Sequence, residues 1–145
     1  MRDLVPLGWV GKLLFRASTK IVAISQAVER EVLRYGWQVR KVIRIPNGVD
    51  LEEFSPGISG LPAREELGIS PEEFVAGMIG QLVPWKGHRT FLEAATFVRQ
   101  RSGQGKFLVV GEDLFGDHPG YREALERRCR ELGLKDDVHF LGYRP

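Results

Sequence analysis

The 145-residue sequence has a single cysteine, no long apolar run and almost no net charge. One cysteine excludes an internal disulfide framework and is typical of a reducing compartment. No apolar stretch approaches the roughly 20 residues that a membrane-spanning helix needs. The 21 basic and 19 acidic residues leave a net charge of +2, which argues against a nucleic-acid partner. We therefore expect a cytoplasmic protein that binds no nucleic acid.

Residues that commonly carry metal or nucleophilic chemistry are also scarce. His88, His118 and His139 are scattered, and with one cysteine they predict no transition-metal site. Ser25 lacks the flanking glycines of a hydrolase nucleophile and is placed to cap a helix. No serine or threonine follows Lys86, so the glycine loop around it is not a P-loop. No catalytic nucleophile or base can be named in this chain.

The first fifteen residues have an amphipathic pattern, with Val10, Leu13 and Leu14 on one side. A lysine interrupts the apolar run and no small-residue cleavage site follows, so this is not a signal peptide. Packing on a sheet is the favoured interpretation. Contact with a membrane surface, at its inner face, stays open as an alternative.

Short apolar runs alternate with helical patterns through most of the chain. Apolar runs predict strands at residues 20–24, 41–45, 74–79, 106–110 and 138–141. The first of these is predicted to be a buried strand. Helical spacing follows Ser25 and recurs over residues 88–101, where Phe91, Ala95 and Val98 form the expected buried face. It recurs again over residues 121–132, with Cys129 as a small buried hydrophobe. This alternation predicts an α/β fold with parallel sheets and right-handed crossovers.

The segment between Pro46 and Pro71 differs from its surroundings. It holds prolines and glycines and no strand pattern. Asp50 and Glu53 have capping-box spacing, which predicts a single helical turn, and residues 61–67 predict a short helix. The segment is typical of a connection between two units.

Ligands of parallel sheets bind beyond the carboxyl ends of the strands, which directs attention to the loops that begin at Gly80, Gly111 and Gly142. In the first loop, Lys86 precedes a helix whose N-terminus attracts anions, so a diphosphate is the candidate ligand. Spacing alone nevertheless favours an ordinary strand–helix connection with a solvated lysine.

The second loop is acidic. Glu112, at the strand end, can accept hydrogen bonds from a sugar or ribose hydroxyl. Asp113 and Asp117 match no familiar calcium loop, so we interpret them as part of a solvated loop.

Three blocks of the sequence resemble the retaining GT-B glycosyltransferases called glycosyl transferases group 1, or family 4. The first block, residues 21–56, contains IPNGVD at residues 45–50. The second contains GQLVPWKGH at residues 80–88, and the third runs from LVVGE at residues 108–112 to VHFLGY at residues 138–143. Their order and spacing agree with the family along most of the chain.

The resemblance implies Rossmann-like parallel sheets of a GT-B enzyme, in incomplete form. Residues 1–47 would end the acceptor-side domain, residues 48–72 would connect the domains, and residues 73–145 would begin the nucleotide-sugar-binding domain. The implied reaction moves a sugar from a nucleotide-diphosphate sugar to a glycan, lipid-linked or small-molecule acceptor, with retention of configuration and without metal or other cofactor. The alternative from another class is a non-catalytic module that binds a nucleotide or sugar phosphate.

The family's glycine-rich acceptor loop and its glutamate pair have no counterpart among these residues. We therefore expect the 145-residue chain alone to be inactive and to self-associate.

The resemblance also assigns site residues. Those expected at the donor diphosphate are Gly80, Gln81, Lys86 and Gly87, and those expected at the nucleotide or sugar are Gly111, Glu112, Gly142, Tyr143 and Arg144. The family usually has an arginine where this chain has Gln81. Glutamine can donate a hydrogen bond but carries no charge, so one cation at the diphosphate is lost.

The departure at Gln81 can be tested by restoring the usual residue. Gln81→Arg should tighten nucleotide-diphosphate binding in the parent enzyme, because a charge-assisted hydrogen bond contributes about 1.5–3 kcal/mol at best and less in a wet site. Calorimetry on both proteins measures the difference. An unchanged or weaker affinity would mean that Gln81 points away from the phosphates or has a role of its own.

Overall fold

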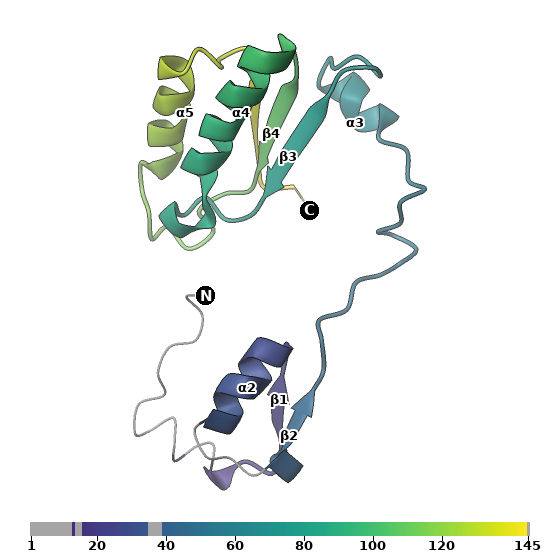
Figure 1. Ribbon diagram of the computed structural model, residues 1–145, viewed down its shortest axis with the longest axis vertical. Coiled ribbons are helices and arrows are strands. Elements are labelled where there is room, and N and C mark those ends of the chain that lie inside the picture. The colour runs from purple at the N-terminus through teal and green to yellow at the C-terminus, as the bar shows by residue number, and fades with distance from the viewer. Residues whose placement is uncertain (1–12, 14–15, 35–38, 145) are drawn as a thin grey trace. The chain divides into compact units, whose positions relative to one another are not determined.

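The computed structural model describes residues 13, 16–34 and 39–144 (Figure 1). The chain divides into two compact units, Met1–Ile58 and Ser59–Pro145. Their assignment to acceptor-side and donor-binding domains stays a prediction. The amphipathic pattern of the first fifteen residues lies almost entirely outside the described residues.

The first unit contains two short parallel strands joined by a helix. Strand β1 (Ile21–Ala23) pairs with β2 (Val42–Arg44), and α2 (Gln26–Arg34) and the single turn η1 (Val39–Lys41) lie between them in sequence. The backbone N–H of Val28 donates to Ser25 Oγ over 3.2 Å, so Ser25 caps α2 as predicted.

Strand β1 is not fully buried, and that part of the prediction is wrong. Ile21 and Ala23 are buried, whereas Val22 is 54% exposed. Helix α2 contacts both strands, and among the described residues nothing comparable covers Val22. Alternate side chains of a strand face opposite sides, so one covering helix buries only one set.

The connecting segment has local turns and no strand among its described residues. Asp50 Oδ1 accepts the backbone N–H groups of Glu52 at 2.8 Å and Glu53 at 3.2 Å, which forms the predicted turn. The predicted short helix is α3 (Leu61–Glu66).

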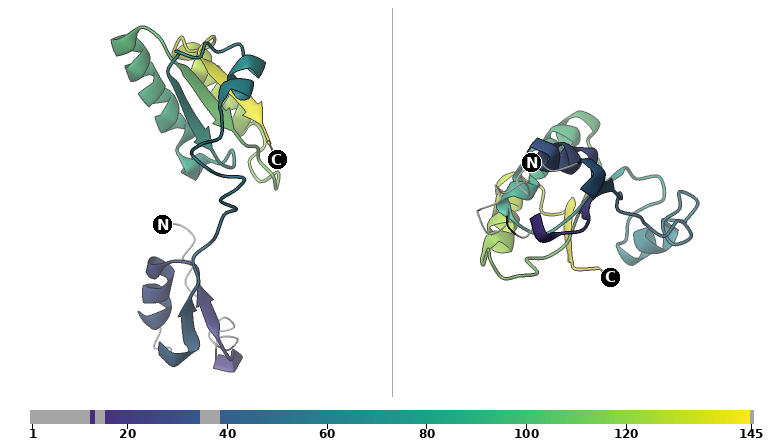
Figure 2. Two further views of the ribbon diagram at one scale, coloured as in Figure 1. Left: turned by 90° about the vertical axis from the view of Figure 1, so that its right-hand side faces the viewer. Right: turned by 90° about the horizontal axis from the view of Figure 1, so that it is seen from below.

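The second unit is a three-stranded parallel sheet in the order β3-β4-β5. Its elements, in chain order after α3, are β3 (Val75–Ile79), η2 (Pro84–Lys86), α4 (His88–Ser102), β4 (Lys106–Val110), α5 (Tyr121–Glu131) and β5 (Val138–Gly142). Helices α4 and α5 lie on one side of this sheet and α3 lies on the other (Figures 1 and 2). The predicted strand–helix alternation and parallel pairing are confirmed.

The core of this unit lies between the sheet and helices α4 and α5. Its buried residues are Leu82, Leu92, Ala95, Phe107, Val109, Leu125, Cys129, Leu134 and Val138. Cys129 is 3% exposed, as predicted, and burial raises the pKa of its thiol. The prediction missed Leu92, which is 1% exposed, while Phe91 and Val98 are only partly buried. The centre of the buried face is therefore formed by His88, Leu92 and Ala95, and Phe91 and Val98 lie at its border.

A charged cluster stabilises the end of the sheet away from the predicted ligand loops. Asp137 is 9% exposed, and its Oδ2 accepts a hydrogen bond from Arg99 Nε at 2.7 Å. Its Oδ1 lies 3.5 Å from Lys106 Nζ, and its carbonyl accepts the N–H of Phe107. Asp137 thus ties α4, β4 and the turn before β5 together.

The sheet face turned away from α4 and α5 has an exposed apolar side chain at the end of β3, where Ile79 is 84% exposed. Phe74, just before β3, is 54% exposed and contacts the core residue Phe107 edge-on. Among the described residues, β3 pairs with β4 alone, so its other edge is open. No described helix is both long enough and apolar enough to cross a membrane.

Self-association of the isolated 145-residue chain is the expected consequence, because exposed apolar surface and an open strand edge favour contacts between copies. Light scattering against concentration should show oligomers or aggregates, and Ile79→Ser should reduce them. Phe97→Ser, on the outer surface of α4, is the matched control, since Phe97 is 58% exposed and does not belong to this face. A monodisperse monomer at every concentration would contradict this prediction.

Candidate functional site

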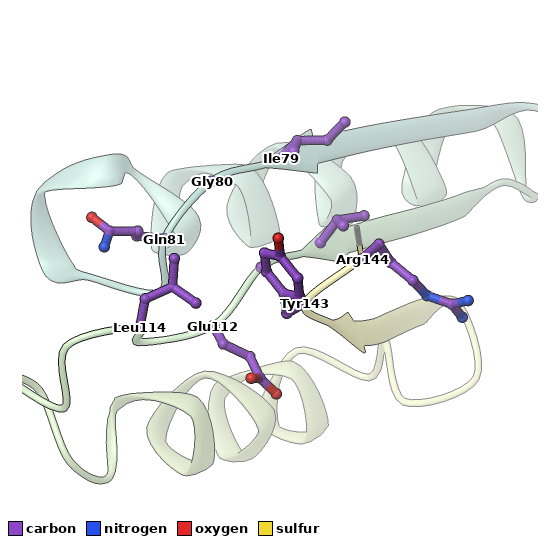
Figure 3. A pocket seen from close by; sticks show the side chains of 9 residues that line it. Ile79, Gly80, Gln81, Glu112, Leu114, Tyr143 and Arg144 are labelled. Carbon is purple, nitrogen blue, oxygen red and sulfur yellow. The ribbon is translucent and has the colours of Figure 1, made fainter. Parts of the chain in front are cut away.

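A pocket of about 180 Å³ lies where β3, β4 and β5 end (Figure 3). The residues that line it are Ile79, Gly80, Gln81, Val110, Gly111, Glu112, Leu114, Tyr143 and Arg144. This is the carboxyl edge of a parallel sheet, where ligands of such folds bind.

Backbone hydrogen bonds hold the three strand ends together beyond the regular strands. The N–H of Gly80 donates to the carbonyl of Val110 over 2.9 Å, and the N–H of Gly111 donates to the carbonyl of Gly142 over 2.8 Å. The N–H of Leu82 donates to the carbonyl of Glu112 over 3.2 Å. The loops after the strands therefore form one continuous floor.

Glycine is required at two points of this floor. Gly111 has φ +133°, and a Cβ atom there would lie 2.0 Å from the carbonyl oxygen of Gly80. Gly142 has φ +69°, and its Cβ would lie 3.1 Å from Glu112 Oε1. Both positions combine a backbone conformation that favours glycine with close neighbours.

The charged side chains of the pocket have partners outside it. Glu112 Oε1 lies 3.8 Å from Arg122 Nη1, and Arg122 Nε is also 3.0 Å from Glu126 Oε1. Arg144 Nη2 lies 2.6 Å from Glu66 Oε1. The lining thus holds one acidic and one basic side chain, each already in an ion pair.

The predicted site residues fall into two groups. Those that line the pocket together are Gly80, Gln81, Gly111, Glu112, Tyr143 and Arg144. Gly142 is buried and contributes its backbone, whereas Lys86 is exposed and neither it nor Gly87 lines the pocket. That any of these residues binds a ligand stays a prediction.

Sequence reasoning missed the apolar part of the lining. Ile79 and Val110 are the last residues of β3 and β4, and Leu114 comes from the following loop. The signal that could have found the first two is their place at the end of predicted strands.

A second hollow, of about 210 Å³, lies beside the start of α5. Asp113 contributes to its wall and accepts backbone N–H groups from Asp117 at 3.3 Å and His118 at 2.6 Å. The loop is mostly exposed, as predicted, and Asp113 also fixes its shape through these two hydrogen bonds. Among the described residues, no three histidine, cysteine, aspartate or glutamate side chains gather closely enough to hold a metal ion.

His88, the first residue of α4, packs beneath the first loop. It is 1% exposed, and neither ring nitrogen has a hydrogen-bond partner among the described residues. Burial lowers the pKa of His88, and a weaker opposing effect comes from the carbonyl of Val83. Its ring meets that of Tyr121 edge-on at 6.1 Å between centroids. His88 therefore packs in the core, where burial favours its neutral form.

Comparison with known proteins gives matches along most of the chain. The family model for glycosyl transferases group 1 matches residues 62–145, and the model for Glycosyltransferase Family 4 matches residues 2–53. The chain is 34% identical over 105 residues to UDP-Gal:alpha-D-GlcNAc-diphosphoundecaprenol alpha-1,3-galactosyltransferase of Escherichia coli, covering 68% of this chain and 27% of that protein. It is 35% identical over 134 residues to D-inositol 3-phosphate glycosyltransferase of Segniliparus rotundus, covering 91% of this chain and 29% of that protein.

Solved structures confirm the expected α/β, GT-B-type fold. The crystal structure of Anabaena Alr3699/HepE in complex with UDP-glucose has a TM-score of 0.78 and 31% identity, covering 94% of this chain and 36% of that one. The crystal structure of WaaG, a glycosyltransferase involved in lipopolysaccharide biosynthesis, has a TM-score of 0.68 at 18% identity, covers 94% of this chain and 38% of that one, and shows likeness of fold alone. The chain spans about a third of the length of each of these two solved structures.

The close approach of Gly111 to Gly80 gives a prediction about stability. Gly111→Ala should lower the free energy of unfolding by about 1–3 kcal/mol through overpacking, with strain from its positive φ added. Gly80→Ala is the control, because a Cβ atom there meets nothing within 4 Å. Urea unfolding of both variants measures the difference. Equal stability of the two would contradict the close packing of the strand ends.

Proposed function

Because the chain belongs to the glycosyl transferases group 1 family, we propose that its second unit forms part of the donor site of a retaining glycosyltransferase. The observation that supports this most directly is the pocket at the ends of β3, β4 and β5, which gathers residues that the family resemblance points to. The parent enzyme would move a sugar from a nucleotide-diphosphate sugar to a glycan, lipid-linked or small-molecule acceptor.

A donor in this pocket would meet complementary groups. The bare backbone at Gly80 and Gly111 allows a ligand to approach closely. The Glu112 carboxylate can accept hydrogen bonds from a sugar or ribose hydroxyl, and the ring of Tyr143, which is 59% exposed, offers an aromatic surface. The likeness to the Anabaena protein, which was crystallised with UDP-glucose, supports a donor of this class.

The reaction needs stabilisation of the departing diphosphate. The N-terminus of α4 follows the first loop, and its free N–H groups and dipole favour negative charge. Lys86 precedes that N-terminus, and Gln81 can add a neutral hydrogen bond. We propose that these groups assist departure of the nucleoside diphosphate without a metal ion.

The expected location of the enzyme is cytoplasmic, with peripheral contact at the inner face of the membrane as a further possibility for the parent protein. The 145 residues alone are expected to transfer no sugar, because the family's glutamate pair has no counterpart in them. A transfer assay on the full-length protein with UDP-, GDP- and ADP-sugars, followed by NMR of the product's anomeric configuration, tests both the activity and the retention. Nucleotide binding without transfer would favour a non-catalytic binding module instead.

The proposed role of Lys86 predicts a loss of affinity. In the parent enzyme, Lys86→Ala should weaken UDP or GDP binding by about 1.5 kcal/mol, or roughly tenfold, because a charge-assisted contact to the diphosphate is removed. Calorimetry measures the affinity, and circular dichroism checks that the variant is folded.

Lys135→Ala is the matched control, since Lys135 is an exposed lysine just before the start of β5, whereas the pocket lies at the other end of that strand. Unchanged nucleotide affinity in folded Lys86→Ala protein would show that Lys86 is not at the diphosphate.

A further inference from the structure

The distribution of charge in the strand-end pocket differs from the distribution that the family resemblance implies. Among the residues that line it, Arg144 is the one basic side chain. Gln81 occupies the place of the usual arginine, and Lys86 does not line the pocket. A negatively charged ligand in this pocket would therefore find its nearest lining cation at the end of β5 rather than at the end of β3.

The Arg144 guanidinium is directed away from the centre of the pocket. It extends away from Gln81, with the ring of Tyr143 lying between the two side chains (Figure 3). Arg144 Nη2 pairs with Glu66 Oε1 at 2.6 Å, across 78 residues of sequence. Arg144 is 46% exposed and Glu66 55% exposed, so both side chains have room to move.

The fold determines where Glu66 lies. Glu66 is the last residue of α3, and the negative end of a helix dipole is unfavourable for a carboxylate without a cation nearby. Arg64 fixes α3 to the turn that leads into β3, because its Nη1 donates to the carbonyls of Ser70 at 2.8 Å and Glu73 at 2.9 Å. Glu66 is thus presented to the end of β5 from a tethered helix.

We propose that Arg144 binds a phosphate group of the ligand from the lining of this pocket, in addition to the groups at the start of α4, and that Glu66 restrains it in the absence of ligand. When a nucleoside diphosphate binds, one of its phosphate groups replaces the Glu66 carboxylate as the partner of the Arg144 guanidinium. A diphosphate carries more negative charge than one carboxylate and offers several acceptor oxygens to the planar guanidinium, so the exchange is favourable. Glu66 competes with the ligand and sets donor affinity from outside the pocket. This inference rests on the proposed donor site.

The test is a comparison of Glu66→Gln with Glu65→Gln by calorimetry with UDP and with uridine. Exposed ion pairs contribute little, so release of Arg144 in Glu66→Gln should tighten UDP binding by about two- to fivefold. Uridine, which has no phosphate, should bind equally to both variants and to the wild type. Glu65→Gln removes the same charge from the neighbouring exposed position of α3 and should leave UDP affinity unchanged.

Arg144→Gln completes the cycle. It should weaken UDP binding about tenfold, and in that background Glu66→Gln should have no further effect. The proposal is overturned if Glu66→Gln leaves UDP affinity unchanged, changes uridine affinity equally, or acts as strongly without Arg144.

The outcomes also separate this inference from the proposed function. If the wild type binds UDP and Glu66→Gln does not change the UDP affinity, the restraint by Glu66 is overturned and the donor site is not. UDP binding by Glu66→Gln but not by the wild type would support it. If the wild type, Glu66→Gln and Glu65→Gln all fail to bind any nucleoside diphosphate, both the donor site and the restraint are contradicted.

Discussion

A Cβ atom at residue 111 would lie 2.0 Å from the carbonyl oxygen of Gly80, so the ends of β3 and β4 can meet only because residue 111 has no side chain. The same residue donates its N–H to the carbonyl of Gly142 and so holds the end of β5 as well. Gly142 in turn leaves space for the carboxylate of Glu112. The strand ends therefore join through their backbones to form the floor of the pocket, and side chains contribute to its walls.

That arrangement suits a ligand with a flat or polar part close to the backbone and charge at one side. Apolar side chains from the strand ends form part of the wall, and the two charged lining residues, Glu112 and Arg144, are paired with residues outside it. Glu112 pairs with Arg122 of helix α5, and Arg144 pairs with Glu66 of helix α3. Helices on both sides of the sheet thus influence the charge that a ligand meets, although neither helix forms the floor.

The core beneath the pocket explains why the first loop keeps its shape. His88 and Leu92 are each 1% exposed and project from the first turns of α4 into the space beneath the sheet. The neutral imidazole of His88 packs against Tyr121, so the start of α4 is anchored by contacts in the core. The helix N-terminus that is expected to face the diphosphate is consequently held in place from below, independently of any ligand.

The sequence by itself determined the order of strands and helices, their parallel pairing and the position of the ligand loops. These follow from local properties, since the periods of apolar residues and the glycines at strand ends are visible along the chain. It also indicated the family and most of the residues that line the pocket. It did not reveal that Asp137 binds Arg99 and Lys106, or that Leu92 and His88 occupy the deepest positions of α4, because those facts depend on how a helix is rotated against a sheet.

Only the tertiary structure decided which charged groups meet. Arg144 and Glu66 are 78 residues apart, and no local pattern predicts their contact. Lys86 and Gln81 are close in sequence, yet only Gln81 lines the pocket, whereas Lys86 is exposed at the end of the turn η2. Sequence patterns specify secondary structure because each residue contributes to it locally. The electrostatics of a site depend on through-space distances, which exist only after the strands and helices have packed.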